Sequence, residues 1–125
     1  FENGTFNNWK THIGGVAAIS GANVFSLIES GPISGRHELF SRAEHSGIYD
    51  QFGNFPVVCP NGSGYSVKLG NTSGGAQAEG ISYEFTIPAN RNEYTLTYYY
   101  AVVFEGPNHN DNEQPRLELE IMDIS

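Results

Sequence analysis

Apolar and polar residues alternate with a period of two in three stretches of the second half of the chain. Such alternation is typical of β-strands that have one buried and one solvent-facing side. The pattern predicts strands over residues 65–69, 81–87 and 116–121. The side chains that we expect to be buried in these strands and in the stretch between them are Tyr83, Phe85, Leu96, Tyr98, Leu119 and Ile121.

Residues 94–104 differ from these stretches because bulky side chains occupy both alternating faces. That pattern predicts a long central strand covered on both sides. The first half of the chain is less regular, and it predicts only short strands near residues 24–28 and 37–42. Residues 52–64 are rich in Gly, Pro and Asn, which predicts a long ordered loop.

The predicted fold class is all-β, an antiparallel β-sandwich of the jelly-roll type. No helix-period apolar stripe persists along the chain, and 15 glycines and 6 prolines are available for turns. Aromatic residues make up 13% of the chain. Because disordered acidic chains lack aromatic residues, we expect a folded domain. A length of 125 residues corresponds to one domain or part of one.

The charge balance excludes several partners. Six Lys and Arg residues against 14 Asp and Glu residues give a formal net charge of −8. Nucleic acid and anionic membranes are therefore not expected to bind, because both need clustered cations. No apolar run approaches the length of a membrane-spanning helix, about 20 residues, so membrane insertion is not expected. The single cysteine, Cys59, has no partner for an internal disulfide.

The chain begins at Phe1 and its only methionine is Met122. We therefore expect residues 1–125 to be a single β-sandwich module, or the N-terminal portion of one, excised from a larger chain.

Several ordered motifs resemble a known family. Residues 1–9 (Phe-Glu-Asn-Gly-Thr-Phe-Asn-Asn-Trp) resemble the start of jelly-roll modules. Together with residues 65–71, 77–83, 98–103 and 106–116, they resemble a domain of gliding-motility-associated and adhesin-like surface proteins that are exported by the type IX secretion system. The resemblance spans nearly the whole chain.

This resemblance implies an extracellular or cell-surface location and a galactose-binding-like β-sandwich. The family's domain continues with further strands beyond a segment like residues 119–123, so we expect this chain to lack its C-terminal strands. A sheet cut in this way exposes unpaired backbone groups along an edge. Neighbouring domains or chains are then the expected partners that complete the sheet.

The resemblance also implies a structural calcium ion, because related carbohydrate-binding modules hold one with an early Glu and a late Asp. The matching positions here are Glu2 and Asp123. Calcium takes six to eight oxygen ligands, which suits carboxylates and backbone carbonyls from both ends of the chain. The alternative is that these are two unrelated surface acids.

A second candidate site is the loop over residues 106–115, which concentrates His109, Asp111 and Glu113 among four amide side chains. Such a loop can coordinate a cation or hydrogen-bond sugar hydroxyls, and loops longer than a tight hairpin are often functional. The alternative is a solvated hairpin rich in turn-forming residues. We add Tyr99, as an aromatic for stacking, and Arg36, which either faces a ligand or has a structural role.

Catalytic residues are not predicted. Glu118 and Glu120 share a strand face at about the spacing of an inverting glycosidase pair. Arg116 precedes them on the same face and would keep a neighbouring carboxylate ionised, and a solvent-facing strand surface explains all three residues. Cys59 has no adjacent basic group, and the serines lack a nucleophile-elbow sequence.

The first hypothesis is therefore a non-catalytic binding or adhesion module of a large surface or secreted protein, with glycan or another surface polymer as its ligand. The alternative is a structural spacer or polymerising subunit of a surface or filament assembly, in which a strand from another chain completes the sheet edge.

Overall fold

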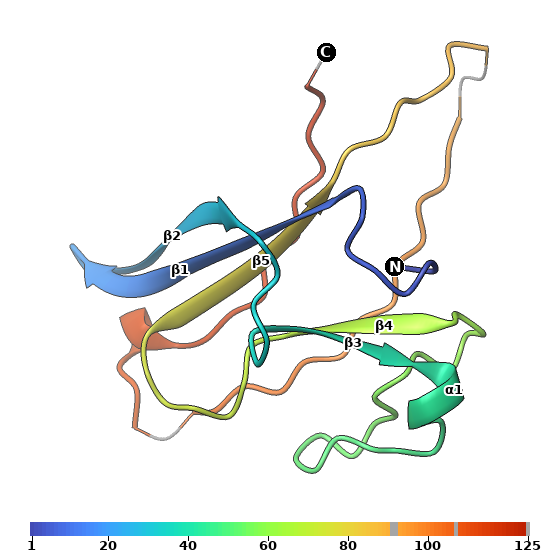
Figure 1. The fold of residues 1–125 in the computed structure, drawn as a ribbon. Coiled ribbons are helices and arrows are strands. Elements are labelled where there is room, and N and C mark those ends of the chain that lie inside the picture. Colours follow the sequence, from blue (N-terminus) through green and yellow to red (C-terminus); the bar gives the residue numbers. More distant parts are fainter. Residues whose placement is uncertain (91–92, 107, 125) are drawn as a thin grey trace.

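The structure, a computed structural model, describes residues 1–90, 93–106 and 108–124 (Figure 1). It is an all-β chain with two antiparallel sheets, which confirms the predicted fold class. The first sheet has the order β2-β1-β5, and the second pairs β3 with β4. The elements are β1 (Trp9–Ile19), β2 (Ala22–Ser30), β3 (His37–Ser41), α1 (Arg42–His45), β4 (Tyr65–Leu69), β5 (Gln77–Tyr83) and the 3₁₀ turn η1 (Asp111–Glu113).

The β1–β2 hairpin is the longest paired feature of the described chain. The two residues of its turn, Ser20 and Gly21, have φ values of 51° and 79°. This is the left-handed conformation that a type I′ turn requires at both positions. The turn lets Ile19 pair with Ala22, and the register continues to Thr11 opposite Ser30. The sequence predicted β2 only in part, and it did not predict β1.

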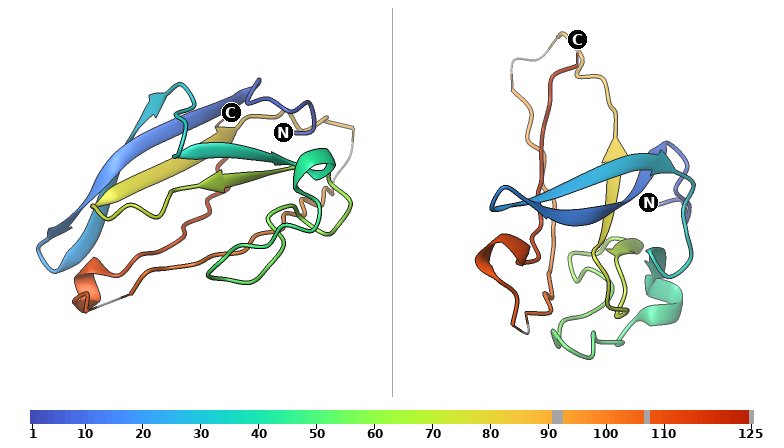
Figure 2. Two further views of the ribbon diagram at one scale, coloured as in Figure 1. Left: turned by 60° about the horizontal axis from the view of Figure 1, so that its bottom comes forward. Right: turned by 90° about the vertical axis from the view of Figure 1, so that its left-hand side faces the viewer.

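The second half of the chain contradicts part of the prediction. Strand β5 ends at Tyr83, and residues 94–104 and 116–121 are not strands. Strand β5 ends there because its partner β1 begins at Trp9, which pairs with Tyr83. Residues 94–104 and 116–121 do not form strands because no described backbone pairs with them. In Figure 2 these stretches run as extended trace beside the sheets.

The predicted burial of six side chains is also wrong. Tyr83 is the last residue of β5 and the other five lie outside the paired strands, and all six are exposed by about half or more: Tyr83, Phe85, Leu96, Tyr98, Leu119 and Ile121. Residues 94–104, expected to be covered on both sides, expose apolar side chains on both alternating faces. Among the described residues, the one buried large apolar side chain is Val58.

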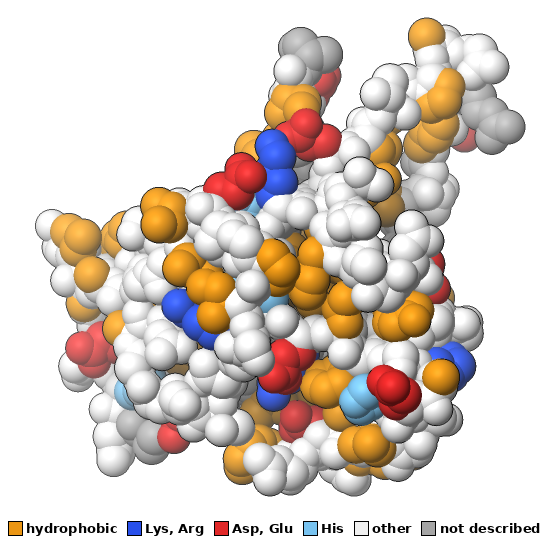
Figure 3. All heavy atoms as spheres, in the orientation of Figure 1, with side chains coloured by type: hydrophobic (Ala, Val, Ile, Leu, Met, Phe, Trp, Pro, Cys, Tyr) orange, Lys and Arg blue, Asp and Glu red, His pale blue; other side chains and the backbone are white. Residues whose placement is uncertain are grey.

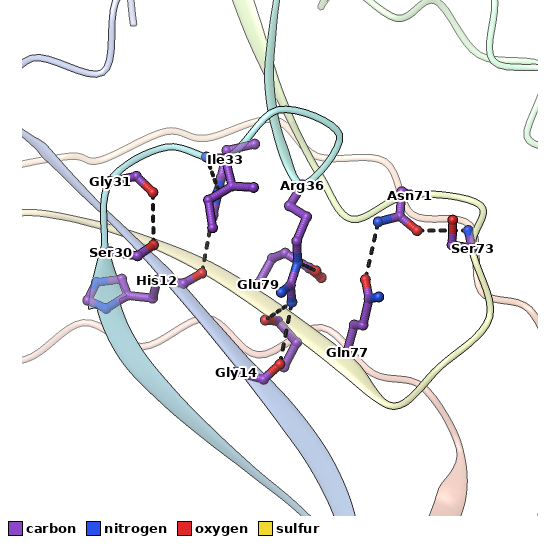
Figure 4. A network of polar contacts seen from close by, with 12 residues as sticks. His12, Gly14, Ser30, Gly31, Ile33, Arg36, Asn71, Ser73, Gln77 and Glu79 are labelled. Carbon is purple, nitrogen blue, oxygen red and sulfur yellow. Dashed lines mark hydrogen bonds and ion pairs between the residues drawn. The ribbon is translucent and has the colours of Figure 1, made fainter.

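Polar contacts rather than an apolar core join the two sheets (Figure 4). Arg36, directly before β3, forms an ion pair with Glu79 of β5, with 2.5 Å between Nε and Oε1. Its Nη2 also donates to the carbonyls of Ala78 at 3.0 Å and Gly14 at 3.4 Å. Because the two charged side chains are only 19% and 10% exposed, this ion pair is shielded from water.

His37 forms a second link between the sheets and is almost fully buried. Its Nδ1 accepts the backbone N–H of Ile33 at 3.2 Å, because an amide N–H can only donate. Nε2 therefore carries the ring proton and donates it to the carbonyl of His12, 3.0 Å away on β1. Both ring nitrogens are satisfied, which is the condition for burying a polar side chain.

The predicted long loop over residues 52–64 is held by specific hydrogen bonds, which confirms the expectation of an ordered loop. The Asp50 carboxylate accepts the backbone N–H groups of Gly53 and Phe52 at 2.8 and 2.9 Å. These bonds stabilise the charged form and hold the pKa of Asp50 below its usual value. Further along, the Arg42 guanidinium donates to the carbonyl of Cys59 at 2.5 Å. These contacts fix the loop against α1.

Candidate functional site

A depression of about 710 Å³ lies between the tip of the β1–β2 hairpin and the η1 turn. Figure 1 shows η1 beneath the hairpin tip, and the left view of Figure 2 places the two elements together again. The wall combines polar side chains with exposed apolar atoms. The lining residues are Gly21, Ala22, Asn23, Asp111, Asn112, Gln114, Pro115 and Arg116.

The η1 segment is held in shape by its own polar groups. The carboxylate of Glu113 accepts the backbone N–H of Asn110 at 3.1 Å and its side-chain amide at 2.7 Å, a capping arrangement. The amide of Gln114 donates to the backbone carbonyl of His109 at 2.9 Å. Glu113 and the His109 carbonyl are therefore used within the loop, whereas Asp111 lines the depression.

Asn23, near the start of β2, connects the hairpin to this loop. Its Nδ2 donates to the carbonyl of Gln114 at 2.7 Å, and its own backbone carbonyl accepts from Nη1 of Arg116 at 2.5 Å. The remaining side-chain oxygen, Oδ1, is buried and has no hydrogen-bond partner among the described residues. A buried acceptor without a partner is costly, and this one belongs to a residue that lines the depression.

Arg116 is immobilised on three sides. Its guanidinium carbon lies 4.8 Å from the centroid of the Phe25 ring, within the range of a cation–π contact. Its Nε lies 2.6 Å from a carboxylate oxygen of Glu118. Together with the hydrogen bond to Asn23, these contacts hold the planar guanidinium beside the depression and leave some of its N–H donors without a described partner.

The resulting set of groups suits a polyhydroxylated molecule. Asp111 supplies two acceptor oxygens, and Asn112 supplies both a donor and an acceptor. Among the described residues, no group of three or more His, Cys, Asp or Glu side chains is placed to hold a metal ion.

The structure distributes the other predicted residues over the molecule. His109, Asp111 and Glu113 lie together around η1, as their spacing implied, while residue 107 of the predicted loop lies outside the described residues. Tyr99 is 65% exposed on the extended segment and does not line the depression. Arg36 belongs to the inter-sheet network, which corresponds to the structural alternative considered for it.

The two residues assigned to calcium lie near opposite ends of the chain. The carboxylate of Glu2 accepts the backbone N–H of Gly64 at 2.8 Å, so it ties the N-terminal loop to the start of β4. The two ends of the chain lie apart in Figure 1 and in the right view of Figure 2. The calcium site stays a prediction.

No family model, no curated protein and no solved structure matches this chain. In the part of the chain that the structure describes, no helix is long and apolar enough to cross a membrane.

Proposed function

We propose that this chain is a non-catalytic binding module of an extracellular surface protein, and that the depression beside η1 binds a glycan. The observation that carries the proposal is that Asp111, Asn112 and Arg116 line one depression, where they offer a carboxylate, an amide and a guanidinium group. Extracellular placement is supported by the sequence resemblance to adhesin-like surface modules. The two lines of support are independent, since one rests on side-chain geometry and the other on sequence motifs.

A neutral or basic glycan fits the depression better than an acidic one. The chain carries a formal charge of −8, and Asp111 places a carboxylate directly in the wall. A carboxylate bridges two neighbouring hydroxyl groups with short, charge-assisted hydrogen bonds. A sulfated or carboxylated sugar would instead meet like charge at this point, although Arg116 also lines the depression.

The contacts of two carboxylates near the depression, Glu118 and Glu113, support binding rather than hydrolysis. Glu118 forms an ion pair with Arg116 at 2.6 Å, and this contact occupies its carboxylate. Glu113 is engaged in capping η1. These contacts give the acids near the depression structural or binding roles.

The proposal is tested by glycan-array binding followed by titration of the best ligand. We expect Asp111→Ala to weaken binding by about 10- to 100-fold, because hydrogen bonds to a charged group contribute roughly 1.5–3 kcal/mol. Asn112→Ala should weaken it by about fivefold, the loss of a neutral bond. Asn7→Ala, an exposed amide in the N-terminal loop, is the matched control and should leave the affinity unchanged. An array on which no glycan is retained, or equal losses in all three variants, contradicts the proposal.

The proposed structural calcium ion has a separate test. Calcium should raise the melting temperature by mass action, and Glu2→Ala should abolish that increase. Because the Glu2 carboxylate also accepts the Gly64 N–H, the variant is expected to melt earlier even in chelator. The informative quantity is therefore the difference between calcium and chelator, with Glu29→Ala as the control for a lost surface acid. Equal melting of the parent chain in calcium and in chelator counts against the ion.

A further inference from the structure

The segment over residues 94–104 is an extended backbone whose polar groups have no described partner. No backbone–backbone hydrogen bond joins it to another described part of the chain. Its start is anchored by a side chain, because the hydroxyl of Tyr94 donates to the carbonyl of Pro88 at 2.5 Å. Eleven extended residues span about 35 Å, which is enough for a full strand pairing.

The same segment exposes a large apolar surface. Eight of its side chains are 43–67% exposed: Tyr94, Leu96, Tyr98, Tyr99, Tyr100, Val102, Val103 and Phe104. Since aromatic side chains each present roughly 150–250 Å², eight half-exposed side chains exceed the few hundred Å² that monomers usually expose. Figure 3 shows exposed hydrophobic side chains, in orange, both on the projecting parts of the molecule and on the face below them.

The rings of this segment are already partly ordered. Tyr98 and Tyr100 stack with their centroids 5.7 Å apart and their planes inclined by 27°. Such a pair lies on one alternating face of the extended chain, as in a strand. A partner strand therefore meets side chains that lose little freedom on binding, which favours association.

Charge determines which strand can pair here. Residues 93–124 contain seven acids (93, 105, 111, 113, 118, 120 and 123) and one base, Arg116, so they carry −6 of the total −8. No described cation lies within ion-pair distance of Glu105 or Glu120. A second copy of this chain would bring the same acidic surface and be repelled, whereas a basic partner is attracted.

We propose that residues 94–104 accept an extended strand from a partner protein, one whose side chains alternate between apolar residues and Lys or Arg. Backbone bonds to the free N–H and C=O groups supply affinity, as in other cases of strand addition. The apolar side chains cover the exposed tyrosines and valines, and the cations face Glu105 and the neighbouring acids. This surface is separate from the depression beside η1, so it stands or fails independently of the glycan proposal.

The test uses synthetic nine-residue peptides and the whole chain. The probe alternates Val with Lys, and the comparison peptides alternate Val with Glu or carry N-methyl groups on alternate backbone amides. We expect the Val-Lys probe to bind at least tenfold more tightly than either comparison peptide, and to bind more weakly as salt is raised. Amide hydrogen exchange should show protection of residues 95–103 when the probe binds.

A pair of proline variants locates the binding surface. Thr97→Pro removes an N–H from the centre of the proposed acceptor segment, and Thr86→Pro removes one from extended backbone outside it. Neither N–H has a described backbone partner, so both variants should keep the melting temperature of the parent chain. Thr97→Pro should lose at least tenfold in affinity for the probe, and Thr86→Pro should not.

Three results overturn the proposal. Equal binding of the N-methylated peptide shows that backbone pairing is not involved. Preference for the Val-Glu peptide shows that charge does not select the partner. Concentration-dependent dimers in low salt, with residues 95–103 protected in the dimer, make a second copy the occupant.

Discussion

Arg36→Leu is expected to lower the free energy of unfolding by about 3 kcal/mol. The substitution removes the partner of Glu79, a carboxylate that lies 2.5 Å from the guanidinium in an environment where its side chain is only 10% exposed. It also removes the donor to the carbonyls of Ala78 and Gly14. The loss is large because a charged group remains shielded from water without a counter-charge. Urea denaturation followed by tryptophan fluorescence measures it, since Trp9 lies in the adjoining sheet.

The double variant Arg36→Leu/Glu79→Leu separates the cost of an unpaired charge from the value of the ion pair. It should recover most of the stability that Arg36→Leu loses, because two apolar side chains of similar volume replace the pair. Lys68→Ala is the control, because its ion pair with Glu38 is 3.8 Å long and well exposed. Loss of that pair should cost less than about 1 kcal/mol. A double variant as unstable as Arg36→Leu would show that the hydrogen bonds to the two carbonyls dominate.

The parts of the fold that the sequence predicted are those in which a local pattern and a partner coincide. Strand β4 has clear period-two alternation, and β3 pairs with it from His37 opposite Leu69 onward. The type of fold followed from composition and turn residues, and it is confirmed. In these places, sequence pattern and hydrogen-bonding partner lead to the same structure.

Sequence-based prediction fails where a strand-like sequence pattern or a hydrogen-bonding partner is present without the other. Residues 94–104 carry bulky strand-forming side chains on both faces, yet no described backbone pairs with them, and side-chain pattern alone cannot supply a ladder of hydrogen bonds. Strand β1 is the opposite case, since Gly14 and Gly15 interrupt its apolar pattern and β-propensity is low there. It forms because β2 and β5 pair with it on both sides.

The candidate site shows the same division. The loop around Asp111 was identified from its length and its polar residues, which are local properties. Asn23 and Arg116 were not identified, because the contact between the start of β2 and the chain after η1 spans 91 to 93 residues of sequence. No local signal marks Asn23; its role depends on the hairpin turn that brings it over the loop.

Gly14→Ala is expected to destabilise the chain by about 3 kcal/mol, or about 10 °C in melting temperature, through overpacking of backbone against backbone. A Cβ at this position would lie 1.7 Å from the carbonyl oxygen of Ser26 and 2.8 Å from its carbonyl carbon, on the paired strand β2. Neither atom belongs to a flexible side chain, so the strands must separate or β1 must shift. Either movement disturbs the register from Ile13 opposite Ile28 to Gly15 opposite Ser26.

Gly31→Ala is the matched control, because nothing lies within 4 Å of the Cβ that it would add. It also shares the entropic benefit of replacing Gly by Ala, about 0.4–1 kcal/mol from restricting the unfolded chain, so it should be neutral or slightly stabilising. The difference between the two variants therefore isolates the backbone contact at Gly14 from the general effect of losing a glycine. Thermal unfolding followed by circular dichroism measures both. Equal melting temperatures for the two variants would mean that β1 and β2 do not approach closely at this position, and the position of Arg36 over the Gly14 carbonyl would have to be revised with it.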